Sequence, residues 1–501
     1  ATIIDSLAEF PARMLVGLNQ RVKEVFDVYE LDLAAAKLTL VAENPGNITA
    51  WGADHAGHLR YAIETDGVNQ TYLYRDAAKG PFMPVLTTTF RDQFAPQFFT
   101  ADNHKLYVAS NIGRDKVAIV LVDPATAKEE RVVYARDDVD VGGLAWSRTR
   151  KRAAYASFQT WKNERHYLDP DAEQVFARLE QELPGYEVTR PESLVSGHRS
   201  TVVGDLGPRT VLRYVMVRMC GRLTKLGYVT PRCPEARLAA SRPINYTARD
   251  GLLVNGYLTL PKDVAPKNIP VIINPHGGPW ARDGWGFNPE VQFLASRGYA
   301  VLQINYRGST GYGRKFWEAS FKQWGFKMQD DVTDAVRWLV QEGIADPKRV
   351  CIYGGSYGGY ATLAGLTQTP DLYACGVDYV GVSNLFTFMN TIPPYWKPFL
   401  GMMHEMVGDP EKDKTLLAAA SPALHADRIK APLLIAQGAR DPRVNKEESD
   451  QMVAALKARG IDVPYIVKDN EGHGFHNEEN QFAFYEAMEE FLDKYIGKSV
   501  N

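Results

Sequence analysis

The most informative segment of the chain is Val350-Cys-Ile-Tyr353-Gly-Gly-Ser356-Tyr-Gly-Gly359, which joins an apolar run to a serine set between glycines. The run Val350–Tyr353 predicts a buried strand, and the residues that follow the glycines predict a helix. Between a strand and a helix, the pattern Gly-x-Ser-x-Gly is typical of a nucleophile elbow, whose glycines relieve crowding while the turn presents the serine hydroxyl above a sheet. The alternative is a glycine-rich turn that holds an ordinary serine.

Two further residues meet the demands of a serine nucleophile. At neutral pH the serine needs a base to accept its proton, and the base needs a carboxylate to orient it. In this type of sheet the order along the chain is Ser, Asp, His. Asp441 follows the apolar run Pro432–Ala436, and His473 follows the run Pro464–Val467, so both lie at predicted strand ends, where open α/β sheets carry their chemistry. Ser356, Asp441 and His473 are the predicted catalytic residues.

Other acids and bases are available near the same strand ends. His476 lies three residues after His473, where a loop runs into a helix, which favours a surface or supporting role. Asp469 precedes His473 by four residues and is typical of a solvated loop.

Acyl transfer also needs hydrogen-bond donors for the oxyanion. The segment Asn274–Trp280 reads Asn-Pro-His-Gly-Gly-Pro-Trp and follows an apolar strand, so its glycines let a backbone N–H approach a substrate oxygen. We expect the two donors to be the N–H groups of Gly278 and of Tyr357, the residue after the nucleophile. His276 is expected to order this loop rather than to catalyse.

The second half of the chain alternates strands and helices. Apolar strand-like runs occur at Val271–Asn274, Ala300–Ile304, Val350–Tyr353, Cys375–Val380, Pro432–Ala436 and Pro464–Val467. Helical patterns occupy Asp331–Gln341, Glu447–Arg459 and Glu478–Tyr495. Because such alternation requires crossover connections, we expect a largely parallel sheet that is covered on both faces.

The first third contains a repeat. An aromatic residue in a strand-like segment, followed by a second strand, recurs at Trp51, Phe99 and Trp146, with spacings of 48 and 47 residues. Short alternating strands at this period are typical of β-propeller blades. A β-sandwich whose strands are similar by accident is the alternative.

The pattern then changes. Residues 169–183 begin with Asp-Pro and carry apolar residues at helical spacing, which predicts a helix. Residues 190–242 hold ten Lys or Arg against three Asp or Glu, spread without a helical-face or aromatic-interleaved pattern. A solvated, irregular region is therefore favoured over an anion site, and the sequence predicts no structure for residues 193–240.

Length and composition argue against several classes of function. The 501 residues exceed what one core serves, and the net charge of -3 gives no electrostatic footprint for nucleic acid or an anionic membrane. Four scattered cysteines form neither a disulfide framework nor a zinc pattern. Residues 1–13 do not resemble a signal peptide, so a cytoplasmic location is expected, with a secreted or periplasmic location after leader removal left open.

Several ordered motifs together resemble the prolyl oligopeptidase family of serine hydrolases, in particular its acylaminoacyl-peptidase-like branch. They are His276-Gly-Gly-Pro279, Asn305-Tyr-Arg-Gly-Ser-Thr-Gly-Tyr-Gly313, Trp324-Gly325, Gly354-Gly-Ser-Tyr-Gly-Gly-Tyr360, Gly438-Ala-Arg-Asp-Pro-Arg-Val444 and Gly472-His-Gly-Phe475. The resemblance covers about residue 243 to the end, and the blade repeats agree with it upstream.

The resemblance implies a propeller over the mouth of an α/β-hydrolase domain, and substrates small enough to enter. It implies that Arg443 binds a substrate carbonyl, with a salt-bridged loop residue as the alternative. It also implies that residues 381–396, including Phe386 and Trp396, wall the acyl-side pocket together with Tyr357. Family propellers commonly need seven or eight blades, whereas the upstream residues allow only about five. Either the propeller is shortened and open, or residues 193–240, where a further blade is expected, carry a locally altered reading frame.

The sequence therefore predicts two domains: a β-propeller-like domain over residues 1–242, shortened or irregular after about 190, and an α/β-hydrolase catalytic domain over residues 243–501. The predicted function is a serine peptidase that cleaves peptide or acyl-amino-acid bonds of small substrates, without metal or cofactor. The alternatives are a carboxylesterase acting on small acyl esters and a non-catalytic propeller binding protein. Expected partners are short peptides or small acyl compounds, and a homo-oligomer is left open.

Overall fold

The computed structural model describes most of the chain, in two compact units. The described residues are 1–7, 9–76, 79–148, 150–184, 187–188, 192–193, 199–206, 210–217, 222–228, 235–393, 396 and 399–497, with the backbone alone for the four stretches between 192 and 228. One unit comprises Ala1–Val175, Gly311–Lys315 and Pro394–Met403, and the other comprises the remaining residues. The domain boundary near residue 242 stays a prediction.

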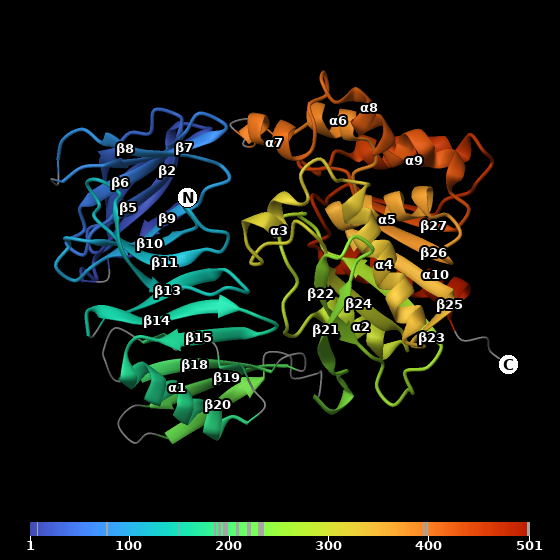
Figure 1. Cartoon of the computed structure of the whole chain (residues 1–501), viewed down its shortest axis with the longest axis horizontal. Coiled ribbons are helices and arrows are strands. Elements are labelled where there is room, and N and C mark those ends of the chain that lie inside the picture. The colour runs from blue at the N-terminus through green and yellow to red at the C-terminus, as the bar shows by residue number, and fades with distance from the viewer. Residues whose placement is uncertain are drawn as a thin grey trace. The chain divides into compact units, whose positions relative to one another are not determined.

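The first unit consists of small antiparallel sheets that follow one another along the chain (Figure 1). The first sheet contains β1 (Thr2–Asp5), β2 (Arg13–Val22), β3 (Val25–Asp32) and β4 (Lys37–Ala42). The second contains β5 (Ile48–Ala53), β6 (Leu59–Thr65), β7 (Asn69–Tyr74) and β8 (Met83–Thr89). The third contains β9 (Phe94–Phe99), β10 (Leu106–Ser110), β11 (Ala118–Val122) and β12 (Glu129–Tyr134), and the fourth β13 (Val141–Ser147), β14 (Arg152–Gln159) and β15 (Asn163–Tyr167).

Each repeat found in the sequence is the first hairpin of one of these sheets. Trp51 lies in β5, Phe99 in β9 and Trp146 in β13, and each strand pairs with the next one in the chain. Neighbouring sheets bury their apolar faces against one another: Tyr61 and Tyr72 of the second sheet, for example, share a core with residues of the third. The predicted propeller-like arrangement of blades is therefore confirmed.

A helix and a further sheet follow. The helix α1 (Pro170–Glu182) begins with proline at its first turn, where the missing N–H costs nothing, as the sequence predicts. Beyond it, the described backbone forms an antiparallel sheet of β16 (Glu187–Val188), β17 (Glu192–Ser193), β18 (Arg199–Leu206), β19 (Thr210–Val217) and β20 (Arg222–Tyr228). The sequence predicts no strands here, and the rest of residues 193–234 lies outside the described residues.

The second unit is built on one eight-stranded sheet with the order β21-β22-β24-β23-β25-β26-β27-β28. These strands are β21 (Ser241–Thr247), β22 (Leu253–Thr259), β23 (Ile269–Pro275), β24 (Ala300–Asn305), β25 (Ala345–Gly355), β26 (Cys375–Tyr379), β27 (Leu433–Gly438) and β28 (Tyr465–Lys468). From β24 to β28 all pairs are parallel, whereas β21 and β22 pair antiparallel. The predicted parallel sheet and all six of its predicted strands are confirmed.

Helices connect and cover these strands. They are α2 (Pro289–Ser296), α3 (Arg314–Glu318), α4 (Lys327–Gln341), α5 (Tyr357–Gln368), α6 (Leu385–Asn390), α7 (Leu400–Met406), α8 (Lys414–Ala419), α9 (Lys446–Lys457) and α10 (Glu478–Ile496), with the 3-10 helices η1 (Glu235–Arg237) and η3 (Pro422–Arg428). The helix predicted from Asp331 begins four residues earlier, at Lys327, because its N-cap residue Phe326 supplies no side-chain cap that the sequence could signal.

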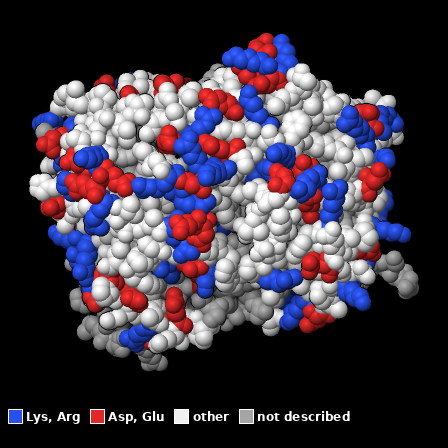
Figure 2. Space-filling view, in the orientation of Figure 1, with Lys and Arg blue, Asp and Glu red and all other residues white. Residues whose placement is uncertain are grey.

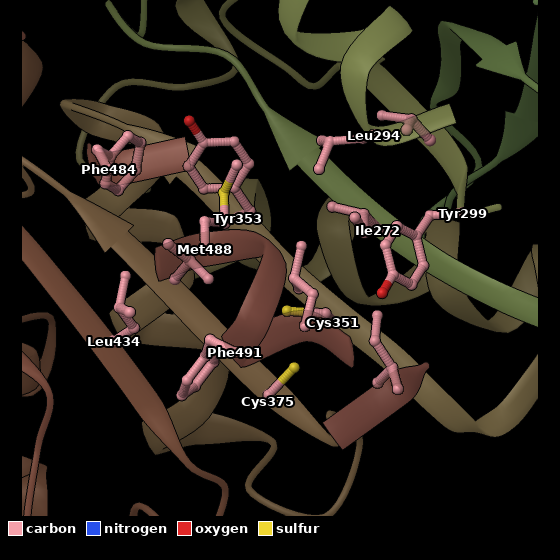
Figure 3. Packing of buried hydrophobic residues seen from close by; sticks show 14 of the residues in the cluster. Ile272, Leu294, Tyr299, Cys351, Tyr353, Cys375, Leu434, Phe484, Met488 and Phe491 are labelled. Carbon is pink, nitrogen blue, oxygen red and sulfur yellow. The ribbon is translucent and has the colours of Figure 1, made fainter. Parts of the chain in front are cut away.

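The central strands are apolar on both faces because helices cover both. Cys351 and Tyr353 of β25 pack in one core with side chains of α2 and α10, such as Leu294 and Phe491 (Figure 3). Ile352 points to the opposite face, where a side chain at Gly365 of α5 would meet it. Each fully buried large side chain contributes roughly 1.5–3 kcal/mol. This rigid layer carries the loops at the carboxyl ends of the strands.

The face of the molecule drawn in Figure 2 is of mixed charge. On the face drawn in Figure 2, Lys and Arg side chains alternate with Asp and Glu rather than gathering in patches of one sign. Among the described residues, no helix combines the length and apolar character needed to cross a membrane.

Candidate active site

Ser356 occupies a sharp turn between β25 and α5. It has φ +60° and ψ -119°, a backbone conformation that residues other than glycine rarely adopt. Two backbone hydrogen bonds hold it there: its N–H donates to the Tyr379 carbonyl at 2.9 Å, and its carbonyl accepts from the Tyr360 N–H at 3.0 Å. Backbone strain of this kind persists only where the surroundings over-determine it. The strand, the turn and the helix predicted for the elbow are all present.

Glycines make this turn sterically feasible. A Cβ at Gly354 would lie 2.7 Å from the Gly358 Cα. A Cβ at Gly358 would overlap the Pro275 carbonyl oxygen at the end of β23. The first turn of α5 therefore packs directly against the neighbouring strand, at a distance only glycine allows.

Asp441 lies in the loop after β27, with its side chain fully buried. Its Oδ1 accepts hydrogen bonds from the backbone N–H groups of Arg443 and Val444 at 2.9 and 3.0 Å. Its Oδ2 lies 2.7 Å from His473 Nδ1 and 3.4 Å from Gln437 Nε2. The carboxylate is thus held by its own loop, with one oxygen aimed at the histidine.

His473 lies in the loop between β28 and α10, with its side chain 17% exposed. The loop packs tightly, because a Cβ at Gly438 would overlap the Gly472 carbonyl oxygen. With the Nδ1–H donated to Asp441, the Nε2 of the neutral ring carries the lone pair that a general base needs. The structure therefore brings the predicted acid and base together.

A buried carboxylate fixes the end of the His473 loop. Glu471 is 2% exposed and accepts from the N–H groups of His476 and Asn477 at 2.9 Å and from Asn480 Nδ2 at 2.7 Å. Burial opposes its ionisation, but these hydrogen bonds outweigh it and lower the pKa of Glu471 to about 2. His476 and Asp469, the competing residues, are both exposed.

The loop predicted to supply an oxyanion donor lies against the nucleophile. A Cβ at Gly277 would stand 3.4 Å from Ser356 Cβ. Gly278 is exposed and has φ +124°, which favours glycine. Tyr357 is the first residue of α5, so its N–H has no acceptor within the helix and lies at the positive end of the helix dipole.

His276 holds this loop. Its ring stacks on Tyr306 with centroids 4.4 Å apart, and its nitrogens lie 2.7 Å from the Gly277 carbonyl oxygen and 2.9 Å from Ser309 Oγ. Desolvation lowers the pKa of His276 to about 4, so the ring is neutral at pH 7. These contacts support the loop-ordering role predicted for it.

The substrate-binding predictions fare differently from one residue to the next. Arg443 is exposed and forms no ion pair with any residue that the structure describes, and its role stays a prediction. Phe386 is half-buried on the first turn of α6. The Tyr357 ring is only 2% exposed and packs on Trp324 at 4.6 Å, which leaves little of it to wall a pocket. Trp396 is half-buried and groups with the first unit, so its role stays a prediction.

Three buried polar residues near this site could not be predicted from the sequence. Gln437 contacts Asp441, Glu448 binds the start of α6, and Asp378 lies beneath the elbow. Each sits within or beside an apolar strand or helix pattern and becomes visible only when distant segments are brought together.

A serine on a strained strand-to-helix turn, at the carboxyl edge of a parallel sheet that also carries a paired aspartate and histidine, is the architecture of an α/β-hydrolase. A sequence model of the prolyl oligopeptidase family matches residues 285–499. Dipeptidyl aminopeptidase BIII of Pseudoxanthomonas mexicana is 39% identical over 505 residues, which cover 97% of this chain and 72% of that protein. The chain therefore belongs to the prolyl oligopeptidase family of serine peptidases.

Other relatives agree. Dipeptidyl peptidase family member 6 of Caenorhabditis elegans is 29% identical over 97% of this chain and 70% of its own length. Among solved structures, a puromycin-hydrolyzing peptidase of Mycobacterium tuberculosis superposes with a TM-score of 0.78 over 97% of this chain and 77% of that one, at 24% identity. This likeness shows a shared fold.

Proposed function

We propose that this chain hydrolyses peptide or acyl-amino-acid bonds of short substrates through Ser356, His473 and Asp441. The observation that carries the proposal is the 2.7 Å contact between His473 Nδ1 and Asp441 Oδ2, made by two loops that end adjacent strands of the sheet bearing the strained Ser356. The contact leaves Nε2 of the ring free to act as a base.

The proposed reaction uses these groups in turn. His473 Nε2 accepts the Ser356 hydroxyl proton while Oγ attacks the scissile carbonyl carbon, and the N–H groups of Gly278 and Tyr357 hold the oxyanion. His473 then gives the proton to the leaving amine, and the C–N bond breaks. Water, deprotonated by the same nitrogen, attacks the acyl-enzyme; the nitrogen returns the proton to Ser356 Oγ as the acyl–oxygen bond breaks and the acid leaves. The Asp441 carboxylate stabilises the imidazolium in both steps.

The substrate class rests on the relatives. By their names, one relative is a dipeptidyl aminopeptidase and another releases acylamino acids. We therefore propose short peptides, or blocked or free N-terminal aminoacyl groups, as substrates. The Arg443 side chain is available to bind a substrate carbonyl, because its guanidinium pairs with no described residue.

Active-site labelling tests the mechanism. A fluorophosphonate probe should label the wild type and should not label Ser356→Ala, because only an activated serine reacts with it. Ser296→Ala, which removes an exposed serine from the end of α2, is the matched control and should label normally. A folded wild type that is not labelled would refute the catalytic assignment and leave a binding protein.

Substrate hydrolysis tests the bond that is cleaved. The wild type should hydrolyse an aminoacyl p-nitroanilide, which has an amine leaving group, as well as the matched p-nitrophenyl ester. Activity on the ester alone would replace the peptidase proposal by a carboxylesterase.

A further inference from the structure

Glu448, on the first turn of α9, is a buried carboxylate that forms hydrogen bonds to the start of α6. Its Oε2 accepts hydrogen bonds from the backbone N–H groups of Ser383 and Asn384, both at 2.8 Å, and its Oε1 accepts from the Thr387 hydroxyl. Its own carbonyl accepts from Ser383 Oγ at 2.6 Å. Glu448 is 1% exposed and forms no ion pair within the described part of the chain. Burial of an uncompensated carboxylate is costly, so these hydrogen bonds are what keep it in place.

A second residue of α9 also forms hydrogen bonds to the start of α6. Gln451, one helical turn further on, accepts from Asn384 Nδ2 and donates to Thr387 Oγ1, each at 3.1 Å. Asn384 in turn caps α6 by accepting from the Phe386 N–H at 3.0 Å. The position of Phe386 is therefore set through Asn384 by two side chains of α9.

The start of α6 lies close to the nucleophile. Tyr379, whose carbonyl holds the Ser356 N–H, ends β26, and α6 begins six residues later. Between them, a Cβ at Gly381 would stand 2.7 Å from the Gly359 carbonyl carbon on the first turn of α5. The segment that carries half-exposed Phe386 thus leaves the sheet beside the elbow, at the strand ends where substrates of open α/β sheets bind.

The same turn of α9 also reaches the catalytic acid. Ser449, next to Glu448, donates to Gln437 Oε1 at 3.0 Å, and Gln437 Nε2 donates to the Val444 carbonyl at 3.1 Å and to Asp441 Oδ2 at 3.4 Å. One turn of helix therefore fixes both the Asp441 loop and the α6 segment.

We propose that Glu448 is a positioning residue for substrate selection: by fixing the start of α6 it sets the place of Phe386 and with it the size of acyl-side group that the site accepts. The proposal rests on the proposed function, because selection is defined for the acyl group transferred to Ser356. Glu448 itself touches neither the reacting atoms nor the triad.

Paired substrates test it. For N-acetyl-Phe and N-acetyl-Ala p-nitroanilides, Glu448→Ala should lower the ratio of the two kcat/KM values at least fivefold, chiefly through KM of the larger substrate, without moving the acid limb of the pH profile. Glu448→Gln should keep the ratio within twofold of wild type, because its amide oxygen still accepts from both N–H groups and its nitrogen can donate to Thr387. Glu447→Ala, which removes the exposed neighbouring carboxylate, is the matched control.

The outcomes separate the two proposals. A folded Glu448→Ala with the wild-type ratio, or a Glu448→Gln as impaired as Glu448→Ala, would overturn the role of Glu448. If Glu448→Ala does not fold, Thr387→Val decides, since it leaves Glu448 in place and removes only the Thr387 hydroxyl, which contacts Glu448, Gln451 and the Asn384 carbonyl. It should lower the ratio measurably, and an unchanged ratio overturns the proposal. A wild type that neither reacts with a fluorophosphonate nor cleaves the anilides would instead refute the proposed function.

Discussion

Asp378 shows how a single side chain can make the active-site region sensitive to pH. It is wholly buried on β26, beside Gly359 and Gly381, and neither carboxyl oxygen has a hydrogen-bond partner among the described residues. Burial, with Glu448 acting in the same direction, raises the pKa of Asp378 to about 7. In the folded protein the group is therefore largely protonated below about pH 6, half ionised near pH 7 and ionised above that.

The sign of the effect on stability follows. In the unfolded chain the carboxyl ionises near pH 4, so between about pH 4 and pH 7 only the unfolded state releases the proton and the folded state loses stability as pH rises. Each factor of ten in proton affinity corresponds to about 1.4 kcal/mol. Asp378→Asn, which cannot ionise, should gain stability over wild type between pH 5 and pH 8 in urea unfolding followed by tryptophan fluorescence.

Asp469→Asn, at an exposed carboxyl, serves as the control and should follow wild type at both pH values. An Asp378→Asn variant whose difference from wild type is the same at pH 5 and pH 8 would show that Asp378 does not titrate in this range.

At the scale of elements, the junction of β25 and α5 depends on how closely the helix approaches β23. Gly358→Ala would drive a methyl group into the Pro275 carbonyl oxygen and push α5 away from the strand. Overpacking of this kind costs about 1–3 kcal/mol, and a displacement near 1 Å at a reacting group costs about 100-fold in rate. We expect a folded protein, by circular dichroism, whose labelling by fluorophosphonate is at least tenfold slower.

A glycine without close neighbours is the control for this change. A Cβ at Gly286 would meet no atom within 4 Å, so Gly286→Ala should label at the wild-type rate. Equal labelling rates for Gly358→Ala and Gly286→Ala would contradict the tight junction.

The same elements show what a sequence can reveal. β23 and β25 could be predicted because short apolar runs bounded by glycine or proline usually form buried strands. Ser356, Asp441 and His473 could be proposed as catalytic residues because each lies in the loop or turn after such a run. Glu448 is not predictable, since its partners Ser383 and Thr387 lie more than 60 residues away and a glutamate near the start of a helix ordinarily faces solvent. Local patterns reveal elements, whereas buried polar contacts depend on how elements meet.

At the scale of the whole molecule, each compact unit has a hydrophobic core of its own. The first unit buries side chains such as Tyr72 and Val120 between neighbouring sheets, and the second buries Cys351 and Phe491 between its sheet and α10 (Figure 3). Units with separate cores can unfold separately. We therefore expect two transitions in differential scanning calorimetry, and loss of fluorophosphonate labelling should accompany only one of them.

Covalent labelling assigns the transitions. The phosphonyl group is attached to Ser356, which belongs to the second unit, so it should raise the transition that destroys labelling more than it raises the other. Ser356→Ala, treated with the same probe, should show neither change. A single transition, shifted as a whole by the probe, would mean that the two cores unfold as one cooperative unit. A destabilising substitution in the blades would then lower the stability of the sheet that carries Ser356 by the same amount.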